Sequence, residues 1–256
     1  MNRIQGKLAL ITGASSGIGE ACARRFAAEG ADVALWARRE ERLRQLADDL
    51  GREHGVAVHV RQVDVRDRGA VRSAVDGLLE TAGPPHILVN NAGLAAGFDP
   101  IQEGDFEDWD RMLDTNVKGL LNVTRMLLPA MIEVDRGHII NIGSTAGHQV
   151  YPKGNVYNAS KFAVTALTEA INLDVVGTSL KVSSVDPGFV ETEFSVVRFH
   201  GDEERADGVY QGFDPLTGDD VADAVAYMAN LPPHVNAFRI ILLPTAQRNV
   251  YVTQRD

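Results

Sequence analysis

Cysteine, lysine and long apolar runs are all scarce in this chain of 256 residues. Its single cysteine, Cys22, lies in the apolar stretch EACARRFAAEG, so disulfide frameworks and thiolate metal cages are excluded and a packed thiol is expected. No run of about 18 apolar residues occurs, and the first residues, MNRIQGKLALITG, lack the long apolar stretch of a signal peptide. These absences predict a soluble, cytoplasmic protein with no membrane partner.

Positive charge is sparse and dispersed as well. Lysine and arginine number 25 against 35 aspartates and glutamates, which gives a formal net charge of −10. Because no basic block could neutralise a row of phosphates, nucleic acid is not an expected partner. The 7 histidines show no HExxH-like pairing, and the acidic residues fall mostly on predicted helical faces, so we expect solvated surface and no metal site.

Short aliphatic runs alternate with longer helical patterns along the chain. KLALI precedes GEACARRFAAEG, DVALW precedes REERLRQLADDLGREH, and VAVHVRQV precedes RGAVRSAVDGLLETAG. HILVN and HIINIG precede helical segments at about 106–134 and 156–177, and LKVSSV and FRIILL complete the series. Uniformly apolar runs suit parallel strands that helices cover on both faces. We predict one α/β domain, residues 1–256, with a doubly wound, Rossmann-like parallel sheet of about seven strands.

One segment breaks this rhythm. Residues 189–218 are rich in Gly, Asp and Glu and contain isolated aromatic residues. A long irregular segment in an α/β domain often covers a binding site, so we predict a substrate lid there.

A glycine-rich turn, TGASSGIG at Thr12–Gly19, follows the first predicted strand. Glycines let the backbone approach a pyrophosphate, and the following helix directs its positive N-terminus at the same point. The spacing alone is weak, since chance produces it roughly 0.2 times in a chain with this glycine content. The strand before it and the helix after it favour a dinucleotide site over a plain tight turn. Its predicted members are Gly13, Ser15, Ser16, Gly17, Ile18 and Gly19.

The end of the second predicted strand bears on the choice between NAD and NADP. An acidic residue that binds the ribose 2′-hydroxyl of NAD belongs there, but the sequence reads Arg38-Arg39. A guanidinium pairs with phosphate through a bidentate fork, whereas a carboxylate repels it. We therefore predict NADP(H), held by Arg38 and Arg39. The alternative is that both arginines merely begin a solvated helix.

Tyr157 and Lys161 lie four residues apart at the start of a predicted helix, so both side chains project from one face. A phenol has a pKa near 10, and an ammonium about 4 Å away contributes on the order of 4 kcal/mol towards lowering it. Ser144 ends the strand HIINIG, at the sheet edge where ligands of such folds bind. Its hydroxyl could steady a carbonyl oxygen that gains negative charge during hydride transfer.

In this order the motifs resemble those of the short-chain dehydrogenase/reductase family: TGASSGIG, the NNAG segment at 90–93, Asn116, Ser144, YNASK at 157–161 and Pro187-Gly188. The resemblance implies that Tyr157 is the general acid/base and that Lys161 holds the nicotinamide ribose and lowers the pKa of the tyrosine. It implies that Ser144 orients the substrate and that Asn116 supports a proton-relay water. Further cofactor contacts carried over are Asp64, Val65, Asn90, Ala92, Gly93, Pro187, Gly188, Val190 and Thr192. Taken alone, Asn116 could be a buried helix amide and Asp64 a helix cap.

Five longer strings, several of them outside these motifs, resemble a subgroup, the NADP-dependent 3-hydroxy acid dehydrogenases that oxidise serine and allo-threonine and reduce malonic semialdehyde. They are EDWDRMLDTNVKGLL, GHIINIGSTAG, GNVYNASK, TEFSVVRFHGD and LPPHVN. The stretch PGFVETEF, residues 187–194, is one residue shorter than expected of that subgroup. The expected activity is hydride transfer between NADP(H) and a small 3-hydroxy acid or its semialdehyde or ketone. The alternatives are a broad carbonyl reductase and a non-catalytic NADP-sensing module, the latter disfavoured by the intact Ser144, Tyr157 and Lys161.

Two further expectations concern the substrate and the assembly. Arg198, in the lid string SVVRFHGD, would bind a substrate carboxylate, since a guanidinium fork suits a planar carboxylate. The alternative is a solvated arginine paired with Asp202 or Glu203. A homotetramer is implied by the resemblance, and the long helices carry more apolar residues than one stripe needs: Met112, Leu113, Val117, Leu120, Leu121 and Val123.

Overall fold

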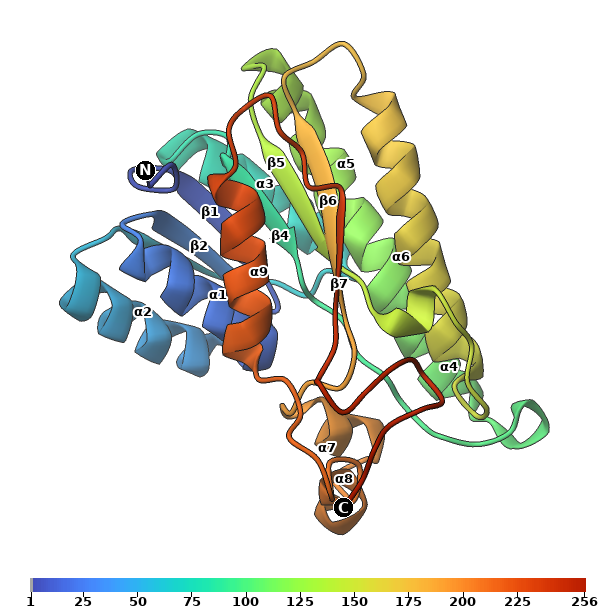
Figure 1. The fold of residues 1–256 in the computed structure, drawn as a ribbon. Coiled ribbons are helices and arrows are strands. Elements are labelled where there is room, and N and C mark those ends of the chain that lie inside the picture. Colours follow the sequence, from blue (N-terminus) through green and yellow to red (C-terminus); the bar gives the residue numbers. More distant parts are fainter. Residues whose placement is uncertain (1) are drawn as a thin grey trace.

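Seven strands form one parallel sheet in the computed structural model, which describes residues 2–256 (Figure 1). Their order is β3-β2-β1-β4-β5-β6-β7, so the direction of winding reverses between β1 and β4. In such sheets the crevice beyond the carboxyl ends at this reversal is where ligands bind. The strands are β1 Leu8–Thr12, β2 Asp32–Ala37, β3 Val58–Gln62, β4 Ile87–Asn90, β5 His138–Ile142, β6 Lys181–Pro187 and β7 Arg239–Leu242.

Helices cover both faces of the sheet, as the alternating pattern predicts (Figure 1). One face packs against α1 Gly17–Ala28, α2 Glu40–His54 and α9 Gly218–Asn230. The other packs against α3 Arg68–Thr81, α5 Leu120–Glu133 and α6 Asn155–Asp174. The predicted doubly wound, Rossmann-like fold is confirmed.

Local chemistry explains where several helices begin and end. Asp67 caps α3 by accepting hydrogen bonds from two backbone N–H groups, and Thr217 and Asp220 form a reciprocal capping box at α9. Gly55, at a φ of +66°, follows the last turn of α2 in the left-handed conformation that glycine adopts without a steric penalty. Cys22 is buried on α1, and burial raises the pKa of its thiol to about 12, which suits a structural residue.

Two predicted segments differ in detail from the structure. The segment at about 106–134 is not one helix: α4 Phe106–Leu113 and α5 are joined by a π-helical turn, η2 Asp114–Gly119. The irregular segment at 189–218 contains two short helices, α7 Phe194–Arg198 and α8 Glu203–Asp207, beyond the carboxyl ends of the strands (Figure 1). Short 3₁₀ turns occur at η1 Ile101–Glu103 and η3 Thr145–Gly147. Within residues 2–256, no helix is both long and apolar enough to span a membrane.

Candidate active site

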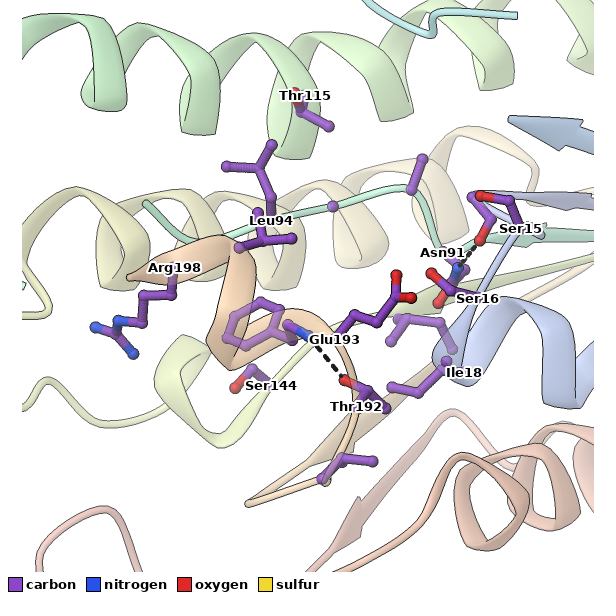
Figure 2. A pocket seen from close by; sticks show the side chains of 18 of the residues that line it. Ser15, Ser16, Ile18, Asn91, Leu94, Thr115, Ser144, Thr192, Glu193 and Arg198 are labelled. Atoms are coloured by element: carbon purple, nitrogen blue, oxygen red, sulfur yellow. Dashed lines mark hydrogen bonds between the residues drawn. The ribbon is translucent and has the colours of Figure 1, made fainter. Parts of the chain in front are cut away.

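A long pocket follows the carboxyl edge of the sheet and is closed on one side by the segment that leads into α7. Figure 2 shows Ser15 and Ser16 at one end, Ser144 and Arg198 at the other, and Glu193 between them. Most residues predicted to contact the cofactor or the substrate line it: Gly13, Ser15, Ser16, Gly17, Ile18, Arg38, Arg39, Asp64, Val65, Ala92, Gly93, Ser144, Tyr157, Lys161, Pro187, Gly188, Val190, Thr192 and Arg198.

The glycine-rich turn forms one end of the pocket mainly from backbone. Gly13 has a φ of +67°, and a Cβ on it would lie 2.9 Å from the Cα of Ala92, so only glycine fits there. Ser16 starts α1 without a hydrogen bond from its side chain to the helix, which leaves the first N–H groups of α1 for a ligand. A helix N-terminus of this kind binds phosphate, so this end fits the pyrophosphate of a dinucleotide.

Two predicted cofactor residues, Gly19 and Asn90, do not line the pocket. A Cβ on Gly19 would lie 2.4 Å from the carbonyl oxygen of Gly13, so Gly19 allows close packing of the turn. Asn90 is buried and donates hydrogen bonds to Thr124 and Asn141. The following residue, Asn91, lines the pocket and donates to the carbonyl oxygens of Thr12 and Gly13. The position of Asn91 in the NNAG motif is the sequence feature that could have identified it as a pocket residue.

Arg38 and Arg39, predicted as a pair, have different surroundings. The Arg39 guanidinium donates to the hydroxyls of Ser15 and Ser16 and to the carboxylate of Glu193, at 3.1, 2.5 and 2.7 Å. The exposed Arg38 lines the pocket, and its charge helps to lower the pKa of Asp64, which Arg66 lowers most through a hydrogen bond. Arg38 is therefore the arginine with its guanidinium available to a 2′-phosphate.

Sequence reasoning missed Glu193, which lies just before α7. Its carboxylate accepts hydrogen bonds from Arg42, at 2.6 Å, and from Arg39, at 2.7 Å. These two arginines lower the pKa of Glu193 to about 2. The ion pairs connect the start of the lid to α2 across the mouth of the pocket. Nothing local in the sequence signals this, because the partners are more than 150 residues apart.

Tyr157, Lys161 and Ser144 meet at the other half of the pocket. Lys161 is buried; its Nζ lies 5.9 Å from the centre of the Tyr157 ring and donates to the carbonyl oxygen of Ile142 at 3.0 Å. Burial raises the pKa of Tyr157, while a hydrogen bond with Ser144 and the charge of Arg198 oppose the rise. Lys161 is not among the groups that shift this pKa, so the expected lowering by Lys161 stays a prediction.

Asn116 lies in η2, outside the pocket. Its Oδ1 accepts from the Leu94 N–H at 2.8 Å, and its Nδ2 donates to the Leu94 carbonyl at 2.8 Å and to Ser160 at 3.0 Å. Both N–H groups of the carboxamide are therefore engaged, and two of its three hydrogen bonds fix Leu94, which lines the pocket. No side-chain N–H is left for a proton-relay water, and the expectation that Asn116 supports one stays a prediction.

Arg198 is held among aromatic rings at the end of α7. Its guanidinium carbon lies 4.6 Å from the ring centre of Phe98, 5.6 Å from that of Tyr151 and 5.7 Å from that of Tyr157. Its Nε donates to the carbonyl oxygen of Gly97 at 3.4 Å, and its Nη2 is buried without a hydrogen-bond partner among residues 2–256. Among residues 2–256, Arg198 forms no ion pair with Asp202 or Glu203, the alternative partners, and Asp202 instead caps α8.

The chain is similar in sequence and in structure to many known dehydrogenases and reductases. Residues 7–202 match the family model described as short chain dehydrogenase. The chain is 46% identical to sulfoacetaldehyde reductase 2 of Chromohalobacter salexigens, over 97% of this chain and 99% of that protein. It is 44% identical to the NADP-dependent 3-hydroxy acid dehydrogenase YdfG of Escherichia coli, over 94% and 96%. The closed form of serine dehydrogenase complexed with NADP+ superposes with a TM-score of 0.91 at 42% identity, covering 97% of this chain and 99% of that one.

Proposed function

The chain belongs to the short-chain dehydrogenase family and is an NADP-dependent oxidoreductase, and on that premise we propose that it interconverts short anionic aldehydes and their alcohols. The proposed substrates carry a carboxylate or sulfonate one methylene away from the reacting carbon. Malonic semialdehyde and its 3-hydroxy acid are one such pair, and sulfoacetaldehyde and its alcohol are another.

The observation that carries this proposal is the position of Arg198. Its buried Nη2 has no hydrogen-bond partner among residues 2–256, and burying an unpaired charged donor is costly unless a ligand pairs with it. The guanidinium stands 5.7 Å from the Tyr157 ring, and Ser144 lines the same pocket. A ligand whose oxygen lies against Ser144 and Tyr157 can therefore place an anionic group on Arg198.

The names of the relatives agree in one chemical feature. In a 3-hydroxy acid the carbon that bears the hydroxyl is joined through C2 to the carboxylate, and in sulfoacetaldehyde one methylene joins the aldehyde to the sulfonate. A guanidinium can pair with either anion. One arrangement of Arg198 and Tyr157 therefore suits both substrates.

The residues along the pocket fit NADP(H). The backbone around Gly13 and the open N-terminus of α1 would hold the pyrophosphate, and Arg38 would hold the 2′-phosphate. Lys161 would hold the nicotinamide ribose through its ammonium. When bound, the cofactor supplies the hydride for reduction or accepts it in oxidation.

The protein's own part in the reaction is to move a proton at the substrate oxygen. In reduction, the neutral phenol of Tyr157 donates its proton to the carbonyl oxygen as the carbonyl carbon gains the hydride, which yields the alcohol. Ser144 donates a hydrogen bond to the same oxygen while negative charge develops on it. Arg198 fixes the far end of the substrate, so the carbonyl is oriented before the proton moves.

A substrate panel tests the proposal. NADPH oxidation is followed with malonic semialdehyde, sulfoacetaldehyde and propionaldehyde, which has no anionic group, on the protein and on Arg198→Met. We expect the variant to lose roughly ten- to hundredfold in kcat/KM on both anions, because a hydrogen bond to a charged group contributes about 1.5 to 3 kcal/mol. Propionaldehyde should change little.

Arg205→Met is the matched control. Arg205 also lies over an aromatic ring, 4.5 Å from the centre of Phe199, but is outside the pocket. It should react with all three substrates as the unaltered protein does. Equal rates of the unaltered protein on anionic and uncharged aldehydes, with equal losses in Arg198→Met, would instead identify a broad carbonyl reductase.

We further propose a homotetramer built on α4, α5 and α6. Of the apolar residues expected at that interface, Met112, Leu120 and Val123 are buried in the chain's own core, whereas Leu113 and Leu121 are 38% and 40% exposed. Phe106 and Phe162, on α4 and α6, are also exposed, at 76% and 41%. Surface of this kind favours burial against another copy. Light scattering at micromolar concentration should give four times the chain mass; a monomer would contradict the proposal.

A further inference from the structure

A buried carboxylate lies behind the pocket at the carboxyl end of β6. Asp186 is 1% exposed and does not line the pocket. Its Oδ2 accepts hydrogen bonds from His148 Nε2 at 2.7 Å and from Ser184 Oγ at 3.1 Å, and it lies 3.5 Å from Arg239 Nε. Its Oδ1 has no hydrogen-bond partner among residues 2–256.

The carboxylate is packed against the strand end that carries the catalytic groups. A Cβ on Gly143 would lie 1.9 Å from Asp186 Oδ1, so Asp186 occupies the space that the missing side chain leaves. Gly143 stands between Ile142, whose carbonyl oxygen accepts a hydrogen bond from Lys161, and Ser144. Asp186 thus contacts the backbone at Gly143, between the carbonyl group that binds Lys161 and the residue Ser144.

Lys161 depends on a nearby negative charge. Its burial lowers the pKa of the ammonium to about 8, and the charge of Asp186 is what opposes a further fall. Below its pKa the side chain is an ammonium that can donate hydrogen bonds and hold a positive charge next to Tyr157. Above its pKa the side chain is a neutral amine, which holds no positive charge and donates weaker hydrogen bonds.

The charged groups around Asp186 come from three other elements. His148 follows η3, Lys161 is on α6, and Arg239 is on β7 and also pairs with Glu169 of α6 at 2.9 Å. Burial raises the pKa of the Asp186 carboxyl, and the hydrogen bond and charge of His148 are the largest influences that lower it. His148 therefore favours the ionised carboxylate.

We propose that Asp186 is a positioning residue for the reaction: held by His148 and packed on Gly143, its carboxylate keeps Lys161 an ammonium at the strand end beside Ser144. The inference deepens the proposed function and rests on it for the roles of Lys161 and Ser144. Asp186 touches neither substrate nor cofactor and acts through Lys161.

The first test reads the charge of Lys161 directly, without cofactor or substrate. The chain has only five lysines, so carbon-13 labelling at lysine Cε gives a simple spectrum, and Lys161→Arg identifies the Lys161 signal. We expect its titration midpoint near pH 8 in the unaltered protein. In Asp186→Asn the midpoint should fall by about one unit, since removal of a nearby opposite charge disfavours the ammonium.

The second test is the pH profile of 3-hydroxy acid oxidation. If the midpoint falls by about one unit, kcat of Asp186→Asn should be about tenfold lower than that of the unaltered protein at pH 9 and nearly equal to it at pH 6. A merely structural role would lower kcat by the same factor at every pH. Asp186→Glu, which keeps the carboxylate charge, should bring both profiles back towards those of the unaltered protein.

Glu169→Gln is the matched control, because it removes a carboxylate that pairs with Arg239 but not the one beside Lys161. It should leave the midpoint of Lys161 unchanged. An unchanged midpoint in Asp186→Asn, or in Asp186→Ser should Asp186→Asn fail to fold, overturns the inference. Because the titration uses no substrate, it can succeed even where the panel of aldehydes refutes the proposed function.

Discussion

The two ends of the pocket are built in different ways. At the cofactor end the walls are mainly backbone: Gly13 is in a conformation that suits glycine, and α1 presents its uncapped N–H groups. At the substrate end the walls are side chains from distant segments, with Arg198 of α7 set among Phe98, Tyr151 and Tyr157. Tyr157 and Lys161, on α6, stand where the two ends meet.

This difference separates what each end can recognise. Backbone N–H groups bind a phosphate whatever molecule carries it, so the cofactor end fixes a cofactor class. Side chains such as Arg198 and Phe98 can be exchanged without moving the sheet, so the substrate end can change its preference while the cofactor end stays the same. Substitutions at each end should therefore affect different measured quantities.

The largest effect is expected where the ends meet. Tyr157→Phe should keep the fold and NADPH affinity but lose about 10²- to 10⁴-fold in kcat, the range general acid–base catalysis commonly contributes. NADPH fluorescence gives the Kd and NADPH absorbance the turnover. Tyr151→Phe is the control, because it removes another phenol close to Arg198 that does not line the pocket. Near-normal turnover in Tyr157→Phe would refute the mechanism.

A smaller effect, confined to cofactor choice, is expected at the cofactor end. Arg38→Asp should weaken NADP binding by roughly ten- to hundredfold, because a hydrogen bond to a charged group contributes about 1.5 to 3 kcal/mol. The Kd for NAD, which has no 2′-phosphate, should change by less than about threefold. Arg39→Met should weaken both cofactors similarly, since that guanidinium is bonded to Ser15, Ser16 and Glu193. Equal loss of NAD and NADP in Arg38→Asp would make Arg38 structural.

The smallest effect is expected at the ion pairs that join the ends. Glu193→Gln should speed NADPH release by about two- to fivefold, because exposed ion pairs contribute only about 0 to 1 kcal/mol each. Since Arg42 and Arg39 hold the pKa of Glu193 at about 2, the carboxylate stays charged down to that pH, and the effect should be constant between pH 5 and 9. Stopped-flow displacement measures it, with Glu191→Gln as control; a pH-dependent effect would contradict the assignment.

The sheet and most of the cofactor end could be predicted from sequence because their signals are local. Buried parallel strands are largely apolar, as in β4 and β5. A backbone position that requires a positive φ is usually occupied by glycine, which can be recognised in the sequence. The pairing of Glu193 with Arg39 could not be predicted, since it depends on how the lid folds back over α2. Likewise Asn90 and Asn91 are identical in type, and only the structure distinguishes the buried amide from the one at the pocket.

The π-helical turn η2 makes the orientation of α4 relative to α5 depend on the number of residues between them. Each residue of an α-helix advances about 100° around the axis, so a turn that holds an extra residue rotates everything beyond it. Deleting one residue between Asp114 and Gly119 would restore a regular helix, but α4 and α5 would then face directions about 100° apart from those they have now. Either Leu127 and Met131 would leave the core or Asn116 would leave Leu94. An insertion or deletion here would therefore disturb either the packing of the core or the pocket wall at Leu94. A substitution at the same positions keeps the number of residues in the turn and need not disturb either.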